Sequence, residues 1–279
     1  MATIVFNVLL MYTVTLLLGA GQAVAGHQSV AYPSGNPTPA MPVITVVYDN
    51  NPYREGLETA WGFSCLVEGM EKTILFDTGG DGKKLLANMD KLRIALRTID
   101  VVVVSHIHGD HTGGLSFLLT KNPHIMTYLP ESFPESFFRE TRKHGSKVVE
   151  ISGPLKICNG VYSTGELGAS PREQSLVVVT AKGLVIITGC AHPGIEKIVR
   201  TVKKNFGREI FLVLGGFHLT ASSKEEIQAI IAKLKALGVH CVAPCHCTGE
   251  TARKLFMKAF GAGFIDAGVG KVIDTVQLQ

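Results

Sequence analysis

Short apolar runs and longer amphipathic stretches alternate along most of the chain. The apolar runs are rich in Val, Ile and Phe and are bounded by Gly, Asp or Asn, a pattern typical of β-strands. We expect strands at 43–49, 62–68, 72–77, 99–105, 124–129, 147–151, 160–164, 175–181, 184–188, 209–214, 239–243 and 263–266. So many strands require two sheets.

Apolar residues at helical spacing predict α-helices at 82–92, 113–120, 132–144, 194–206, 223–237 and 249–260. The helix after Ser222 has the clearest pattern. Ile227 and Leu234 lie on its apolar face, and Glu225 stands where a capping box places an acid. Gly238 is the expected stop. This order of elements predicts an α/β fold, a sandwich of two sheets with helices outside.

The first 25 residues form a compositional block of their own. An apolar run from Val8 to Leu18 is followed by Ala23-Val24-Ala25, a small-x-small pattern typical of a signal-peptidase site. The run is shorter than the roughly 20 apolar residues that span a bilayer. We therefore expect residues 1–25 to be a cleaved signal peptide and the mature protein to be exported, periplasmic or extracellular, without stable membrane insertion. No Lys or Arg precedes Arg54, so the alternative is an uncleaved N-terminal anchor or a cytoplasmic protein.

Residues 26–42 are rich in Gly, Pro, Ser and Asn and predict a flexible linker, so we expect the folded domain to cover 43–279. The chain is 46% apolar and 18% charged, which is enough for one α/β core. Its formal charge of +4 is spread over isolated Lys and Arg residues, without a basic stripe. This composition favours a small-molecule substrate over a nucleic-acid partner and leaves the oligomeric state open.

The cysteines do not have the spacing of a disulfide scaffold. Six of them stand at 65, 158, 190, 241, 245 and 247, an even number that would permit disulfides in an oxidising compartment. Cys190, Cys245 and Cys247 lie beside histidines instead. In that setting a role at or near a metal competes with a disulfide.

The strongest chemical signal follows the apolar strand at 99–104. Four potential metal ligands lie within six residues: His106, His108, Asp110 and His111. They cannot share one face of a helix or a strand, so we expect them to fan out from a loop around metal ions. A loop at the carboxyl end of a strand is also where α/β proteins bind ligands. The alternative is a solvated His-rich turn that binds no metal.

The H-x-H-x-D-H pattern followed by Thr-Gly-Gly resembles the signature of the metallo-β-lactamase superfamily. Leu75-Phe76-Asp77-Thr78-Gly79 resembles the early Asp motif of the same superfamily. The resemblance implies an αββα four-layer sandwich with metals where the sheets meet. It also implies that Asp77 supports the ligand loop without binding metal itself.

The resemblance further implies two metal ions. His106, His108 and one later histidine would hold the first ion, and Asp110, His111 and a last histidine the second. Ligand sets rich in imidazole with some carboxylate favour zinc, and iron or manganese would fit too. We therefore expect two Zn²⁺ ions.

The later ligands are less clearly marked. Cys190 stands where many relatives carry a bridging Asp, and His192 follows it closely. No histidine occurs near Glu166, Glu173 and Gln174, where relatives often have their third-motif ligand. This absence favours His192 as the ligand. Cys190 as a thiolate ligand, and His192 as a cap of the next helix, are the alternatives.

Two further histidines end strands. His246 follows a short apolar strand, where family members have their last ligand, and we expect it to bind metal. Cys245 and Cys247 should point to the opposite side of an extended backbone, so we expect them to pack or to pair. His218 could contact the substrate or donate a proton, and a buried core histidine is equally compatible with its position.

Three motifs, Thr-Gly-Cys-x-His-Pro-Gly, Gly-Gly-Phe-His-Leu and His-Cys-Thr-Gly, resemble one branch of the superfamily. That branch carries the name 7,8-dihydropterin-6-methyl-4-(β-D-ribofuranosyl)aminobenzene-5′-phosphate synthase. A pterin substrate would need a flat aromatic surface. Candidates are Trp61, Phe63, Phe133 and Phe217, although such residues are more often part of the core.

The resulting prediction is a metal-dependent hydrolase that activates water against an ester, phosphoester or amide-like bond. Asp110 would orient the attacking water and His218 would donate to the leaving group. One alternative is a transferase of the dihydropterin synthase type that releases pyrophosphate. The other is a non-catalytic protein that binds metal.

Overall fold

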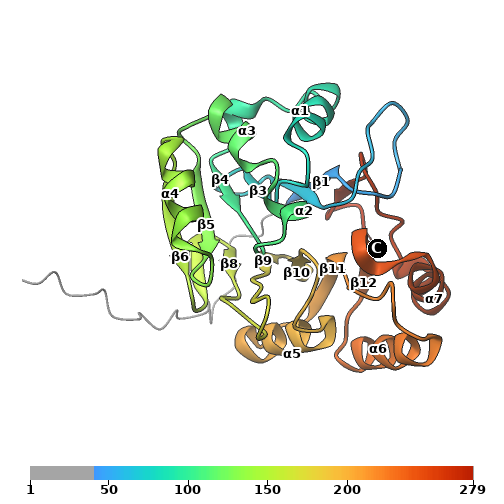
Figure 1. Ribbon diagram of the computed structural model, residues 1–279. Helices are drawn as coiled ribbons and strands as arrows, with labels where there is room; N and C mark the ends of the chain where they lie inside the picture. The colour runs from blue at the N-terminus through green and yellow to red at the C-terminus, as the bar shows by residue number, and fades with distance from the viewer. Residues whose placement is uncertain (1–40, 279) are drawn as a thin grey trace, which may run out of the picture.

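The computed structural model describes residues 41–278 (Figure 1). The predicted signal peptide and all but the last two residues of the predicted linker lie outside the described residues. Within the described part, no helix is both long enough and apolar enough to cross a membrane.

Two mixed sheets form the centre of the molecule. The first has the strand order β13-β1-β2-β3-β4-β5-β6 and the second the order β12-β11-β10-β9-β8-β7. The strands of the first sheet are β1 Val43–Tyr48, β2 Ser64–Glu68, β3 Ile74–Phe76, β4 Val101–Val103, β5 Met126–Pro130, β6 Lys147–Ile151 and β13 Val272–Asp274. Those of the second are β7 Leu155–Cys158, β8 Val161–Ser163, β9 Leu176–Thr180, β10 Gly183–Thr188, β11 Ile210–Gly216 and β12 Cys241–Cys245.

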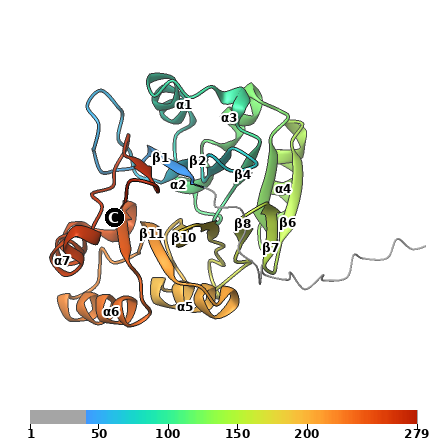
Figure 2. The same cartoon turned by 180° about the vertical axis from the view of Figure 1, so that it is seen from behind.

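Helices cover the outer faces of both sheets (Figures 1 and 2). The α-helices of the described residues are α1 Gly82–Lys91, α2 Gly109–Thr112, α3 Leu115–Lys121, α4 Glu135–Lys143, α5 Ile195–Phe206, α6 Lys224–Ala236 and α7 Glu250–Phe260. α1, α3 and α4 pack on the first sheet, and α5, α6 and α7 on the second. The predicted αββα sandwich is therefore confirmed.

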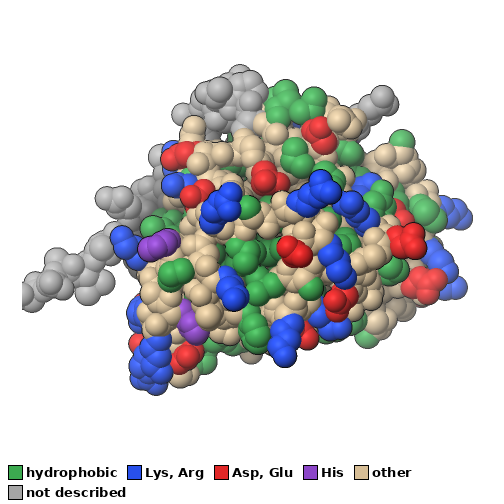
Figure 3. Space-filling view, turned by 90° about the horizontal axis from the view of Figure 1, so that it is seen from above, with side chains coloured by type: hydrophobic (Ala, Val, Ile, Leu, Met, Phe, Trp, Pro, Cys, Tyr) green, Lys and Arg blue, Asp and Glu red, His purple; other side chains and the backbone are tan. Residues whose placement is uncertain are grey.

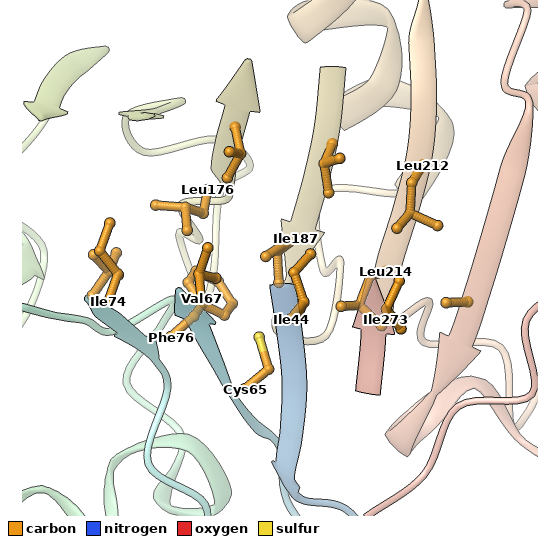
Figure 4. Packing of buried hydrophobic residues seen from close by; sticks show 14 of the residues in the cluster. Ile44, Cys65, Val67, Ile74, Phe76, Leu176, Ile187, Leu212, Leu214 and Ile273 are labelled. Atoms are coloured by element: carbon orange, nitrogen blue, oxygen red, sulfur yellow. The ribbon is translucent and has the colours of Figure 1, made fainter. Parts of the chain in front are cut away.

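The apolar strands are continuous because both of their faces are buried. Along β10, Val185 and Ile187 point into the core between the sheets, whereas Leu184 and Ile186 point to the helices. Figure 4 shows the core between the sheets, where Ile187 meets side chains of the opposite sheet such as Ile44. In the view of Figure 3, which looks down on the molecule from above Figure 1, Lys and Arg side chains are mixed with Asp and Glu on the surface.

Some predicted boundaries differ from the structure. The segment 263–266 is not a strand, because Phe264 makes only an isolated bridge to Val242. β7 and β13 were not predicted, since they are short and owe their conformation to pairing with β8 and β1. The capping box of α6 lies one residue later than expected, at Ser223 and Glu226.

The topology brings distant turns to one edge of the sandwich. β3 and β4 are parallel neighbours in the first sheet, and β10, β11 and β12 are parallel neighbours in the second. Carboxyl ends of parallel strands lie at the same edge of a sheet. All the candidate ligands follow these strand ends.

Candidate metal centre

The turn after β4 carries the first ligands. His106 is fully buried and His108 is exposed, and His108 is the N-cap residue of α2. Asp110 and His111 belong to this short helix. The expected loop is therefore a loop followed by one helical turn, in which Nε2 of His111 lies 3.6 Å from the Asp110 carboxylate.

Asp77 anchors this turn from the end of β3. Its carboxylate is buried and accepts hydrogen bonds from the Ser105 N–H, at 2.6 Å, and the Ser105 hydroxyl, at 2.8 Å. Nδ1 of His111 lies 2.7 Å from the same carboxylate. Burial lowers the pKa of His111, but the Asp77 carboxylate outweighs burial and raises it. Asp77 thus directs Nε2 of His111 toward the centre of the site.

The first donor group consists of His106, His108 and His192, whose nitrogens lie within 4.8 Å of one another. Nε2 of His106 is 3.1 Å from Nδ1 of His108. Burial and the neighbouring histidines lower the pKa of His106 to about 2. His106 is therefore neutral, which is the form that binds metal.

Glu173 holds His192 in place, a role that the sequence did not reveal. Its buried carboxylate accepts hydrogen bonds from the hydroxyl of Thr188 and the N–H groups of Gly189, Cys190, Ala191 and His192. It also lies 2.9 Å from Nδ1 of His192. Burial raises the pKa of Glu173, but its hydrogen bonds, first that with the His192 ring, outweigh burial and lower it. The only sign of this role in the sequence is an acidic residue just before an apolar strand.

The second donor group consists of Asp110, His111, Cys190 and His246, again within 4.8 Å of one another. Nε2 of His111 lies 3.2 Å from the Cys190 sulfur. Burial raises the pKa of Asp110, but His246 and His111 outweigh it and hold that pKa below its usual value. The sequence presented Cys190 and His192 as alternatives, whereas the geometry gives each a position in a different group.

The hydrogen-bond partners of His246 indicate whether a metal ion fits the second donor group. Its Nδ1 lies 2.9 Å from the Asn50 side-chain oxygen, and its N–H donates to Asp49 at 3.1 Å. Nε2 is buried and has no hydrogen-bond partner among the described residues, although it lies 3.3 Å from an oxygen of Asp110. An unpaired buried nitrogen facing a carboxylate fits a cation between them.

The two cysteines beside His246 do not behave alike. Cys245 points away from the donor groups toward Asp49, as expected. Cys247 turns back toward the site, so its expected orientation was wrong. The reason is that β12 ends at Cys245 and residues His246–Thr248 form a 3-10 turn, which breaks the alternation of a strand. All six cysteines are free.

His218 lies at the mouth of the site. Its side chain is exposed, which contradicts the core alternative, and its ring is 4.6 Å from that of His192. A pocket of about 400 Å³ begins at these two histidines and extends between α5 and α6.

The four aromatic candidates for a substrate surface differ in their exposure to solvent. Phe63, Phe133 and Phe217 are buried core residues. Trp61 is 54% exposed, and its ring lies 4.9 Å from the His246 ring. Trp61 is therefore the one exposed member of the predicted set.

Comparisons with known proteins agree with this geometry. The sequence profile of the metallo-β-lactamase superfamily matches residues 62–246. A protein of Methanocaldococcus jannaschii named 7,8-dihydropterin-6-methyl-4-(β-D-ribofuranosyl)-aminobenzene-5′-phosphate synthase is 31% identical, over 83% of this chain and 95% of its own length. Similarity to the branch expected from the motifs is thus confirmed.

Solved structures show the same fold. Tm1679, a metal-dependent hydrolase of the β-lactamase superfamily, superposes with a TM-score of 0.72 at 32% identity, over 84% of this chain and 98% of Tm1679. YhfI of Bacillus subtilis, a metallo-β-lactamase fold protein, superposes with a TM-score of 0.64 at 18% identity, over 84% of this chain and 99% of its own. The expectation of an enzyme is confirmed, and the chain belongs to the metallo-β-lactamase superfamily.

Proposed function

We propose that the protein is a metal-dependent hydrolase with a dinuclear zinc centre. The observation that carries this proposal is the pair of adjacent donor groups, each of which converges within 4.8 Å. The first ion would be held by His106, His108 and His192, and the second by Asp110, His111, Cys190 and His246. Imidazole, carboxylate and thiolate together favour zinc, with iron or manganese as the next choices.

The surrounding residues would prepare these ligands. Asp77 and Glu173 occupy Nδ1 of His111 and of His192, which leaves Nε2 of each ring for a cation. Two bound cations would supply an activated water and stabilise negative charge on a carbonyl or phosphoryl oxygen. Asp110 would orient that water. His218, exposed at the mouth of the site, would donate a proton to the leaving group.

We propose small ester, phosphoester or amide-like molecules as substrates. The similarity to Tm1679, named as a metal-dependent hydrolase, supports hydrolysis. The bond would lie over the two donor groups, and the pocket beyond His192 and His218 would take the remainder of the molecule.

A second candidate is a transferase of the dihydropterin synthase type. It is favoured by the similarity to the archaeal synthase along nearly its full length. The exposed ring of Trp61 beside His246 supports it independently, because a pterin could stack there. In this reaction the same cations would hold a pyrophosphate leaving group.

Metal content tests the centre directly. Elemental mass spectrometry on the purified full chain should find about two zinc ions per molecule. His108→Ala and His192→Ala should each lose about one ion. His124→Ala is the matched control, because His124 is exposed and belongs to neither donor group. A wild-type chain without metal would overturn the proposal.

Activity assays separate the two reactions. Zinc-loaded protein should hydrolyse members of a panel of phosphoesters, lactones and carboxylic esters faster than His108→Ala does. With a dihydropterin pyrophosphate, release of pyrophosphate only when an arylamine is present would identify the transferase instead. Trp61→Ala should raise KM for the pterin and leave KM for simple esters unchanged.

We also propose that residues 1–25 direct export. The basis is the apolar run and the Ala-x-Ala ending. N-terminal sequencing of protein recovered from the periplasm or medium should begin after Ala25. Recovery of the intact N-terminus in the membrane fraction would favour an anchor.

A further inference from the structure

We propose that Cys190, His218 and Cys247 form a third cation site beside the two donor groups described above. The proposed function uses neither Cys247 nor the ring nitrogen of His218 as a ligand. The inference rests on the proposed dinuclear centre in one respect, because Cys190 would be shared between the second and the third cation.

The geometry of the three side chains suits a cation. The sulfurs of Cys190 and Cys247 and a ring nitrogen of His218 lie within 4.8 Å of one another. Bond lengths of about 2.3 Å to sulfur and 2.0–2.1 Å to nitrogen place tetrahedral zinc ligands roughly 3.5–3.8 Å apart. Closing the group around an ion therefore requires movements of about 1 Å or less.

The backbone fixes His218 against Cys247. His218 has φ +54°, a left-handed conformation that a residue with a side chain adopts at a cost. On one side of it, the Phe217 N–H donates to the Thr248 hydroxyl at 3.0 Å. On the other side, the Leu219 N–H donates to the Cys247 carbonyl at 3.2 Å. The two turns thus hold the imidazole and the thiol in one arrangement.

The sulfur of Cys247 occupies space that a glycine leaves open. A Cβ atom at Gly216 would lie 2.6 Å from this sulfur, so only glycine admits it there. The thiol is buried and lies 3.7 Å from the Cys190 carbonyl oxygen, to which it donates. Its position therefore results from packing on β11 as well as from the turn after β12.

The donor chemistry indicates which ions would bind. Two thiolates and one imidazole are soft ligands that favour zinc, cadmium or copper(I). Three protein ligands leave one position open, as in catalytic zinc sites. Because His218 also lines the pocket of about 400 Å³, a substrate oxygen or a phosphate group could reach that position.

Cadmium titration of the full chain tests the inference. Metal-free protein, kept reduced with a phosphine, is titrated with Cd²⁺, and bound metal is counted by elemental mass spectrometry after desalting. Thiolate-to-cadmium absorption in the ultraviolet is recorded in parallel. The variants are His218→Ala and Cys247→Ser, and His124→Ala and Cys158→Ser are their matched controls outside the donor groups.

We expect about three Cd²⁺ per wild-type chain and about two in His218→Ala and Cys247→Ser. Cys247→Ser should also lose part of the thiolate-to-cadmium absorption, whereas both controls should match the wild type. His218→Ala is the decisive variant, because its side chain is exposed and its removal leaves the core intact. Circular dichroism checks that each variant is folded.

Two results would overturn the third site. The first is a wild-type chain that binds only about two ions, which would leave the proposed dinuclear function standing. The second is a His218→Ala variant that keeps all the wild-type ions or loses more than one of them. A wild-type chain that binds no ion would refute both proposals, so the two failures are distinguishable.

Discussion

Glu173→Gln probes how a buried residue outside the donor groups controls a ligand. One carboxylate oxygen accepts a hydrogen bond from the backbone N–H of His192 and contacts Nδ1 of the His192 ring. The other oxygen accepts hydrogen bonds from N–H groups of the turn after β10, such as that of Cys190. The glutamine side chain has one oxygen and one NH₂ group. Wherever the NH₂ points, it meets donors that previously had an acceptor.

The expected cost follows from these contacts. An unmet buried donor costs about 1–3 kcal/mol, and hydrogen bonds to a neutral acceptor are weaker than those to a carboxylate. Glutamine is neutral, so the folded protein no longer has to bury a charge at this position, which offsets part of this cost. We therefore expect the free energy of unfolding of the metal-free protein to fall by about 2–4 kcal/mol.

Glu173→Gln should also weaken metal binding directly, through the orientation of the His192 ring. If the NH₂ group donates to Nδ1 of His192, the ring must carry its proton on Nε2 and cannot bind a cation there. We expect the affinity of the first cation to fall roughly 10–100-fold. Urea unfolding of the metal-free protein and competition with a chromophoric chelator measure the two quantities.

The control is Glu140→Gln, which removes an exposed acid whose main partner is Lys143. Ion pairs on the surface contribute little to stability, so both quantities should remain close to the wild type. If Glu173→Gln bound zinc with wild-type affinity and unfolded at the wild-type urea concentration, the positioning role assigned to Glu173 would be refuted.

Three further outcomes are expected. Asp77→Asn should weaken binding of the second cation roughly 10–100-fold, because His111 loses the charged carboxylate that fixes its ring, and calorimetric titration with zinc would measure this. Ile187→Ala should lower the free energy of unfolding by about 2–5 kcal/mol through a cavity between the sheets, with the number of bound ions unchanged. Removing metal with a chelator should lower Tm, since the proposed cations would bind the folded chain in preference to the unfolded one, and equal Tm values with and without zinc would contradict that coupling.

Much of the fold could be predicted from the chain, because its strands are buried on both faces and therefore read as plain apolar runs. The strand β10 is such a run, and its bounds differ from the prediction by one residue. β13 escaped prediction because it has three residues, one of them the half-exposed Val272, and its extended form depends on pairing with β1.

The candidate site was predictable where its residues are neighbours in the sequence. His106, His108, Asp110 and His111 reveal themselves by spacing alone. The role of Glu173 could not be seen, because it depends on a turn that reaches the carboxylate only after β9 and β10 pair. The direction of Cys247 was missed for a similar reason, since a single 3-10 turn decides which way the thiol points.

Each of the two donor groups of the proposed dinuclear centre draws on both halves of the chain. His106 and His108 follow a strand of the first sheet, whereas His192 follows a strand of the second, and the other group divides in the same way. Cations held in this manner would act as a cross-link between the two sheets. Neither half could then retain the centre after separation from the other.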